Sequence, residues 1–129
     1  MPSRDDLHKY QERMINFIYT TPKCALWAGL GLGKTITTLT AIVDLIDSMT
    51  VSKVLIVAPL RVANSVWHKE AANWQHTKHL RFSIVTGSEK ERLAALHKTA
   101  DVYVINRENV SWIVEHYAKK WPFDMIVLD

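Results

Sequence analysis

The sequence predicts an α/β fold in which a mostly parallel sheet carries helices on both faces. Five short apolar runs alternate with longer stretches of helical periodicity, an order that is typical of a parallel sheet. Most of the runs are almost continuously apolar, as expected for strands that are buried on both sides. Right-handed crossover connections would then place helices on both faces of the sheet. At 129 residues, the chain has the length of one domain.

Each element can be placed along the chain by its pattern. The apolar runs predict strands at 24–29, 53–59, 81–87, 101–106 and 123–129. Apolar residues at steps of three and four predict helices between the strands. A further helix, at about 5–19, precedes the first strand. The helices that follow it are expected at 34–49, 62–74, 89–97 and 109–120.

Local signals refine three of these helices. Ser88 is a suitable N-cap for helix 89–97, and Pro122 disfavours helix at the residue before it, which ends helix 109–120. Trp67 and Trp74 are seven residues apart on the apolar face of helix 62–74. This spacing favours packing in the core over stacking against nucleic-acid bases.

Charge and cysteine content limit the partners and the cellular compartment that the protein can have. The formal net charge of +3 permits a partner that carries phosphates but does not require one. Cys24 is the single cysteine, so a disulfide framework is excluded and a reducing compartment is favoured. The polar start is unlike a secretory signal, and no apolar run approaches the ~18 residues that a bilayer crossing needs. We therefore expect a cytoplasmic protein without membrane contact.

The stretch "WAGLGLGKT" lies between a predicted strand and a predicted helix. Backbone N–H groups converge at such a helix start and can bind an anion, and glycines let the backbone approach a phosphate closely. Lys34 offers a positive charge to the terminal phosphates, and the Thr35 hydroxyl suits a magnesium ion. Ala28 occupies the first position of the phosphate-loop pattern, so only the relaxed form is matched. A flexible turn would explain the glycines but not the lysine and threonine, so we predict phosphate binding.

Three further stretches suggest a family. They are "LHKYQERMINFI", "APLRVANSVWHKEAANW" and "FDMIVLD", the last of which is a Walker B pattern that ends in Asp129. Together with the loop, they resemble the N-terminal RecA-like motor domain of Swi/Snf-type superfamily 2 helicase-like ATPases. The chain departs from that family at Ala28-Gly29, where an acidic pair is frequent, and at 105–108, where Thr-Thr-Tyr-Glu is frequent. The first departure fits a phage or bacterial member.

The resemblance implies a set of site residues, with ATP and Mg²⁺ as cofactors. Gln11 is expected to recognise adenine, and Arg61 is either a contact to a DNA phosphate or a plain surface arginine. Lys34 and Asp129 take the catalytic positions, and Thr35 and Asp129 are the candidate magnesium residues. The phosphate-binding residues implied are Leu30, Gly31, Leu32, Gly33, Lys34 and Thr35.

The resemblance also implies the domain organisation. We expect one truncated RecA-like domain over 1–129, with the adenine-motif helix region in 1–22 and the P-loop core in 23–129. A second RecA-like domain would belong to the parent chain, so this piece alone should hydrolyse ATP very poorly. In the family's sheet, a strand that follows Walker B separates the strands that correspond to 24–29 and 123–129. Without it, these strands should either pair directly or recruit another chain through open sheet edges.

The function expected is the ATP-binding half of a DNA-dependent ATPase of the helicase-like translocase type, with weak binding to duplex DNA. The alternative is a P-loop nucleotide-binding module or a small kinase without motor activity. Stimulation of ATP hydrolysis by duplex DNA would distinguish the two.

Overall fold

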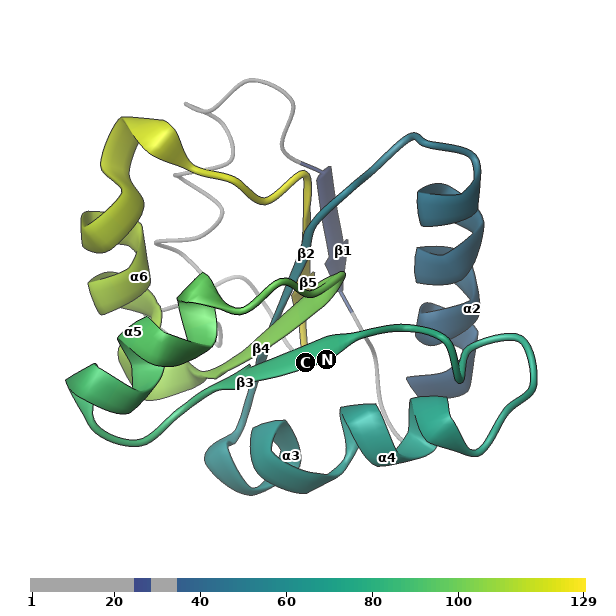
Figure 1. Ribbon diagram of the computed structural model, residues 1–129, viewed down its shortest axis with the longest axis horizontal. Coiled ribbons are helices and arrows are strands. Elements are labelled where there is room, and N and C mark those ends of the chain that lie inside the picture. Colours follow the sequence, from purple (N-terminus) through teal and green to yellow (C-terminus); the bar gives the residue numbers. More distant parts are fainter. Residues whose placement is uncertain (1–24, 29–34) are drawn as a thin grey trace, which may run out of the picture.

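The computed structural model describes residues 25–28 and 35–129, and the centre of this part is a five-stranded sheet (Figure 1). The strands are hydrogen-bonded in the order β1-β5-β2-β4-β3, and each neighbouring pair is parallel. Every strand lies inside one of the five predicted apolar runs. Their bounds are β1 (Ala25–Ala28), β2 (Val54–Ala58), β3 (Phe82–Val85), β4 (Val102–Asn106) and β5 (Met125–Leu128).

The burial of the strands explains the apolar runs. Every residue of β2, β4 and β5 is buried, whereas β3, at one edge of the sheet, alternates between half-buried and buried positions. A strand in the middle of the sheet has no solvent side, so neither of its faces tolerates a run of polar residues.

One face of the sheet is covered by α2 (Thr35–Asp47), α3 (Leu60–Ser65) and α4 (Trp67–Ala72). Side chains alternate along β2, and Val54, Ile56 and Ala58 point to this face. They pack in one cluster with side chains of the three helices, namely Leu39, Ile42, Val43, Ala63, Trp67 and Ala71.

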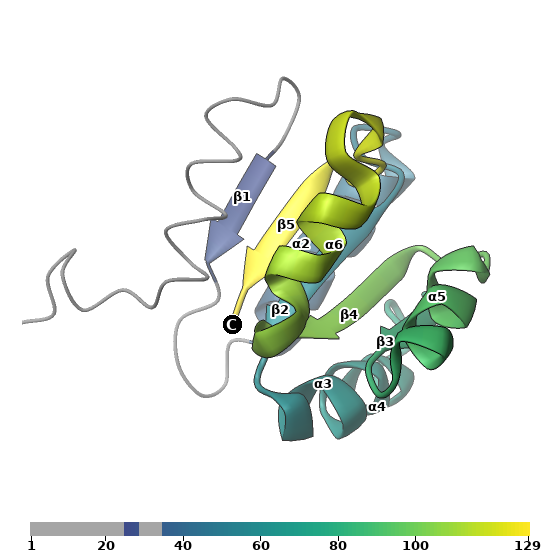
Figure 2. The ribbon, with the colours of Figure 1, turned by 90° about the vertical axis from the view of Figure 1, so that its left-hand side faces the viewer.

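The opposite face is covered by α5 (Glu89–His97) and α6 (Val110–Tyr117), as Figures 1 and 2 show. Here the inward side chains of β2 are Leu55 and Val57. They share a second cluster with Leu96 of α5 and with Val110, Ile113 and Val114 of α6. With helices on both faces of a parallel sheet, the predicted fold class is confirmed.

The predicted helix 109–120 has a short 3-10 turn at each end. Its α-helical part is α6, and it is flanked by η2 (Arg107–Asn109) and η3 (Ala118–Lys120). Ala118 has a φ of 47°, which stops the α-helical path before Pro122 is reached. Among the helices of the described residues, none combines the length and the apolar character that a membrane crossing requires.

The predicted helix 62–74 is wrong in two respects. It is interrupted at Val66, whose φ of −97° and ψ of −57° separate α3 from α4. The Ser65 hydroxyl donates a hydrogen bond to the Arg61 carbonyl one turn back, a contact that often bends helices. Because α4 ends at Ala72, Trp74 leaves the helical face and is 44% exposed, whereas Trp67 is buried as predicted.

The start of α5 matches its predicted N-cap. The Ser88 hydroxyl accepts a hydrogen bond from the Glu91 backbone N–H, and the Glu91 carboxylate accepts one from the Ser88 N–H. This reciprocal pair is a capping box. Gly87 precedes it with a φ of +89°, and a Cβ atom there would lie only 2.8 Å from Glu91 Oε1. Glycine therefore satisfies both the backbone conformation and the space beside the cap.

Strands β1 and β5 pair directly, which confirms one of the two outcomes expected for them. Ala25 lies beside Met125 and Ala28 beside Leu128, in parallel register. Figure 2 shows the two strands side by side at one edge of the sheet. Self-association through sheet edges stays a prediction.

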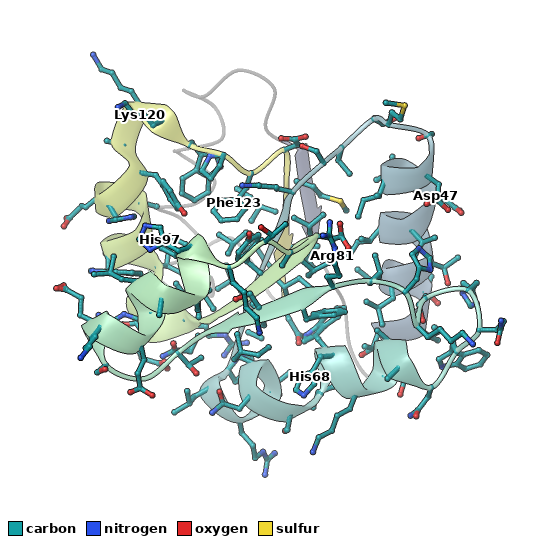
Figure 3. The ribbon with its side chains drawn as sticks, viewed as in Figure 1. Asp47, His68, Arg81, His97, Lys120 and Phe123 are labelled. Carbon is teal, nitrogen blue, oxygen red and sulfur yellow. The ribbon has the colours of Figure 1, made fainter. Side chains whose placement is uncertain are left out.

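An ion pair joins the residue before β4 to the residue before β3. Arg81 donates to both carboxylate oxygens of Asp101, with Nη2 3.0 Å from Oδ1 and Nε 3.3 Å from Oδ2 (Figure 3 labels Arg81). The Arg81 backbone N–H donates to the same carboxylate at 2.9 Å. Partial burial raises the pKa of Asp101, but the hydrogen bonds and charge of Arg81 outweigh it and hold the pKa below its usual range.

Asp101→Asn should lower the free energy of unfolding by about 1 kcal/mol at pH 7. Since the pKa of Asp101 is lower in the folded chain, its carboxylate stabilises the fold above the unfolded pKa of about 4. That contribution is lost as the pH falls through the folded pKa. Urea unfolding of both proteins from pH 7 to pH 3 should show their difference shrinking below pH 4. Asp47→Asn, at an exposed position of α2, is the control, and an equal loss there would contradict the assignment.

Candidate functional site

The carboxyl ends of β1 and β5 lie side by side at one end of the sheet. Ala28 and Leu128 are register partners, and Asp129 follows β5 directly. α2 begins at Thr35. Ligands of open α/β sheets bind at the carboxyl ends of the strands, so this end is the candidate functional site.

Asp129 is held by hydrogen bonds from three separate elements. Its backbone N–H donates to the Val57 carbonyl of β2 at 2.8 Å. Trp67 of α4 donates from Nε1 to Oδ2 of the Asp129 carboxylate at 3.1 Å. Arg107 of η2 donates from Nη2 to the main-chain oxygen of Asp129 at 2.7 Å. Both the backbone and the side chain of Asp129 are therefore fixed from outside its own strand.

Thr35 opens onto a pocket of about 210 Å³ between α2 and α4. The other lining residues are Ile36, Val66 and Glu70. Glu70 Oε1 accepts a hydrogen bond from Trp74 Nε1 at 3.1 Å. Glu70 lies one helical turn beyond Trp67, so α4 carries both the residue that contacts Asp129 and the residue that shares a pocket with Thr35.

A polar network follows β4 at the same end. Asn106 is 6% exposed, donates from Nδ2 to Glu108 Oε2 at 3.0 Å, and accepts from Asn109 Nδ2 at 2.8 Å. The sequence pattern indicates only that this segment departs from the family. It does not predict the hydrogen bond between Arg107 and Asp129. The signal that could have found the contact is position, since both residues follow parallel strands and therefore lie at the same end of the sheet.

The predicted site residues have different outcomes. Thr35 is the first residue of α2, Asp129 follows β5, and Arg61 is exposed as the second residue of α3, while their roles stay predictions. Its exposure suits either role considered for it. The adenine and loop positions fall outside the described residues, namely Gln11, Leu30, Gly31, Leu32, Gly33 and Lys34.

The donor atoms at this end of the sheet fit a magnesium ion. Mg²⁺ prefers oxygen ligands and usually keeps several waters, so it needs only one or two groups from the protein. The hydroxyl of Thr35 and the carboxylate of Asp129 are groups of this kind. Neither residue is fully buried, so both can be reached by a ligand.

Comparisons with known proteins agree with the motifs. A family model described as the SNF2-related domain matches residues 10–129. Protein p41 of Acyrthosiphon pisum secondary endosymbiont phage 1 is 41% identical over 122 residues, which cover 93% of this chain. The same alignment covers 26% of the phage protein, so the chain spans about a quarter of the length of that relative.

Proposed function

This chain belongs to the SNF2-related domain family, and from that premise we propose that it is the ATP-binding half of a DNA-dependent, helicase-like ATPase. The observation that carries the proposal is the position of Asp129, directly after β5 at the carboxyl end of the sheet. α4 contacts its carboxylate through Trp67 and shares a pocket with Thr35 through Glu70. A phosphate loop and a Walker B carboxylate must lie at the same end of the sheet to act on one nucleotide.

The residues then take distinct roles. Gln11 binds the adenine edge, the loop from Leu30 to Gly33 surrounds the phosphates, and Lys34 offers its charge to the terminal ones. Mg²⁺, when bound, neutralises charge on the phosphate oxygens. Thr35 binds the ion through its hydroxyl, and Asp129 accepts hydrogen bonds from its waters. Phosphoryl transfer depends mainly on such positioning and charge stabilisation.

Duplex DNA is the proposed partner of the motor. The family supports this partner, and the exposed Arg61 is a candidate contact to a DNA phosphate. The net charge of +3 is small, so binding by this chain should be weak and should fall as salt rises. We further propose a second RecA-like domain in a longer parent protein, which the quarter-length match to the phage relative supports.

Calorimetric titration with ATP and Mg²⁺ tests nucleotide binding. Lys34→Ala removes a charge-assisted contact worth roughly 1.5–3 kcal/mol, so we expect about a ten- to hundredfold loss of affinity. Lys90→Ala is a matched control, because Lys90 lies in the first turn of α5, another helix start, on the opposite face of the sheet. Equal affinity of the wild type and Lys34→Ala would contradict the assignment.

A second measurement separates a motor from a passive module. In the parent protein, duplex DNA should raise the rate of ATP hydrolysis, and Lys34→Ala should abolish the stimulated rate. Tight ATP binding without any stimulation by DNA would favour the nucleotide-binding module or the small kinase instead.

A further inference from the structure

The indole of Trp67 reaches the Asp129 carboxylate from inside the core. Trp67 is 2% exposed and is among the largest fully buried side chains, and its Nε1 lies 3.1 Å from Asp129 Oδ2. We propose that Trp67 is a positioning residue, which holds the Asp129 carboxylate in the orientation that accepts hydrogen bonds from magnesium-bound water. This inference rests on the proposed function and gives Trp67, which lies in one of the quoted motifs, a role at that site.

The backbone of Asp129 is held by two hydrogen bonds, but these do not fix the torsions of its side chain. Val57 and Arg107 hold the backbone of Asp129 on either side of its Cα atom. Neither of these two contacts determines where the carboxylate points. The bond from Trp67 ends on the carboxylate itself, so it selects one side-chain orientation. A misplaced group near the chemistry can lower a rate strongly, and this is why such orientation matters.

An indole is well suited to this task. It donates through Nε1 and accepts nothing, so it cannot compete with the carboxylate for water protons. It is also neutral, so it leaves the negative charge of Asp129 available to a cation. A carboxylate has about four acceptor sites, and the indole occupies one of them.

The position of the indole is fixed by packing. Trp67 belongs to the cluster in which α2, α3 and α4 meet the sheet. A ring packed on this face cannot rotate freely, because protein interiors are as dense as organic crystals. The bond therefore links the orientation of Asp129 to the core, and no flexible surface side chain is involved.

The test compares nucleotide binding with and without magnesium. Trp67→Phe removes the N–H group and keeps an aromatic ring. Titration with a non-hydrolysable ATP analogue should show about a three- to tenfold loss of affinity with saturating Mg²⁺, the equivalent of one net hydrogen bond. With EDTA present, the affinity should match that of the wild type. In an Asp129→Asn background, Trp67→Phe should cause no further loss.

Trp112→Phe is the matched control, because Trp112 also donates from Nε1 to a carboxylate oxygen, that of Glu89, on the opposite face of the sheet. It should leave both affinities unchanged. Equal losses for Trp67→Phe with Mg²⁺ and with EDTA, or no loss at all, would overturn the positioning role alone. A wild type that binds no nucleotide would overturn the proposed function, and this inference with it.

If Trp67→Phe does not fold, the positioning role can be tested by NMR of the Trp67 indole in proteins that keep this residue. With ¹⁵N-labelled tryptophan, adding Mg²⁺ to the nucleotide complex should move the indole resonance of Trp67. The same addition should leave that resonance unmoved in Asp129→Asn, and the Trp112 resonance unmoved in both proteins. If the Trp67 resonance of the wild type does not shift when Mg²⁺ is added, the positioning role is wrong.

Discussion

Trp67→Ala should lower the free energy of unfolding by about 3–5 kcal/mol, as truncation of a large buried aromatic residue generally does. Trp67 is 2% exposed, and it packs where α4 meets α2 and the sheet. Its removal leaves a cavity that the surrounding side chains fill only in part. Since domains are typically stable by about 5–15 kcal/mol, the variant should unfold at much lower urea concentration. Urea titration followed by circular dichroism measures the change.

Trp74→Ala is the control, because Trp74 has the same side chain seven residues further along. It is 44% exposed, so truncation should change the free energy of unfolding by less than about 1 kcal/mol. Similar losses for the two variants would mean that the indole of Trp67 is not a principal part of the core.

Phe123→Ala should also lower the free energy of unfolding by about 3–5 kcal/mol, because Phe123 is buried on the other face of the sheet. Phe123 is 3% exposed, and its ring lies edge-on to three others, with centroids 5.5 Å from Tyr103, 5.7 Å from Tyr117 and 5.1 Å from Trp121. Figure 3 shows Phe123 inside the molecule, whereas Lys120 extends outward. Thermal unfolding, with ellipticity as the signal, should show a large fall in Tm.

Two variants separate the ring contacts from general effects of substitution. Phe123→Leu keeps most of the apolar volume and loses the edge-on contacts, so its loss should be smaller, about 1–2 kcal/mol. Lys120→Ala, at an exposed position, should change little. If Phe123→Ala cost no more than Phe123→Leu, the packing described around Phe123 would be wrong.

The sheet could be predicted because strands that are buried on both faces have almost continuously apolar sequences. The runs around β2, β4 and β5 are almost continuously apolar, and these strands are buried at every residue. The start of α5 was equally predictable, because the capping by Ser88 depends on residues three positions apart. Signals of this kind are local and do not depend on the rest of the fold.

What could not be predicted depends on contacts between distant segments or on small changes in backbone angle. Helical periodicity continues through Val66, so the spacing alone could not reveal the interruption between α3 and α4 or the exposure of Trp74. The bonds from Trp67 and Arg107 to Asp129 join residues far apart in sequence. A predicted parallel sheet places the residues that follow its strands at one end, but which of them are neighbours depends on the order of the strands, and this order is not evident from a single sequence.

The pairing of β1 with β5 has a consequence for how the protein folds. The earliest and the latest of the described strands are direct neighbours, so the loop that closes between them contains all the other described strands and helices. Closing a long loop costs chain entropy before any contact repays it, and folding slows as contacts become more distant in sequence. The β2–β4–β3 part can form first, because its strands are closer in sequence. The pairing of β1 with β5 should therefore form late. Refolding of the candidate site, which lies at the carboxyl ends of these strands, should be slower than refolding of the β2–β4–β3 part.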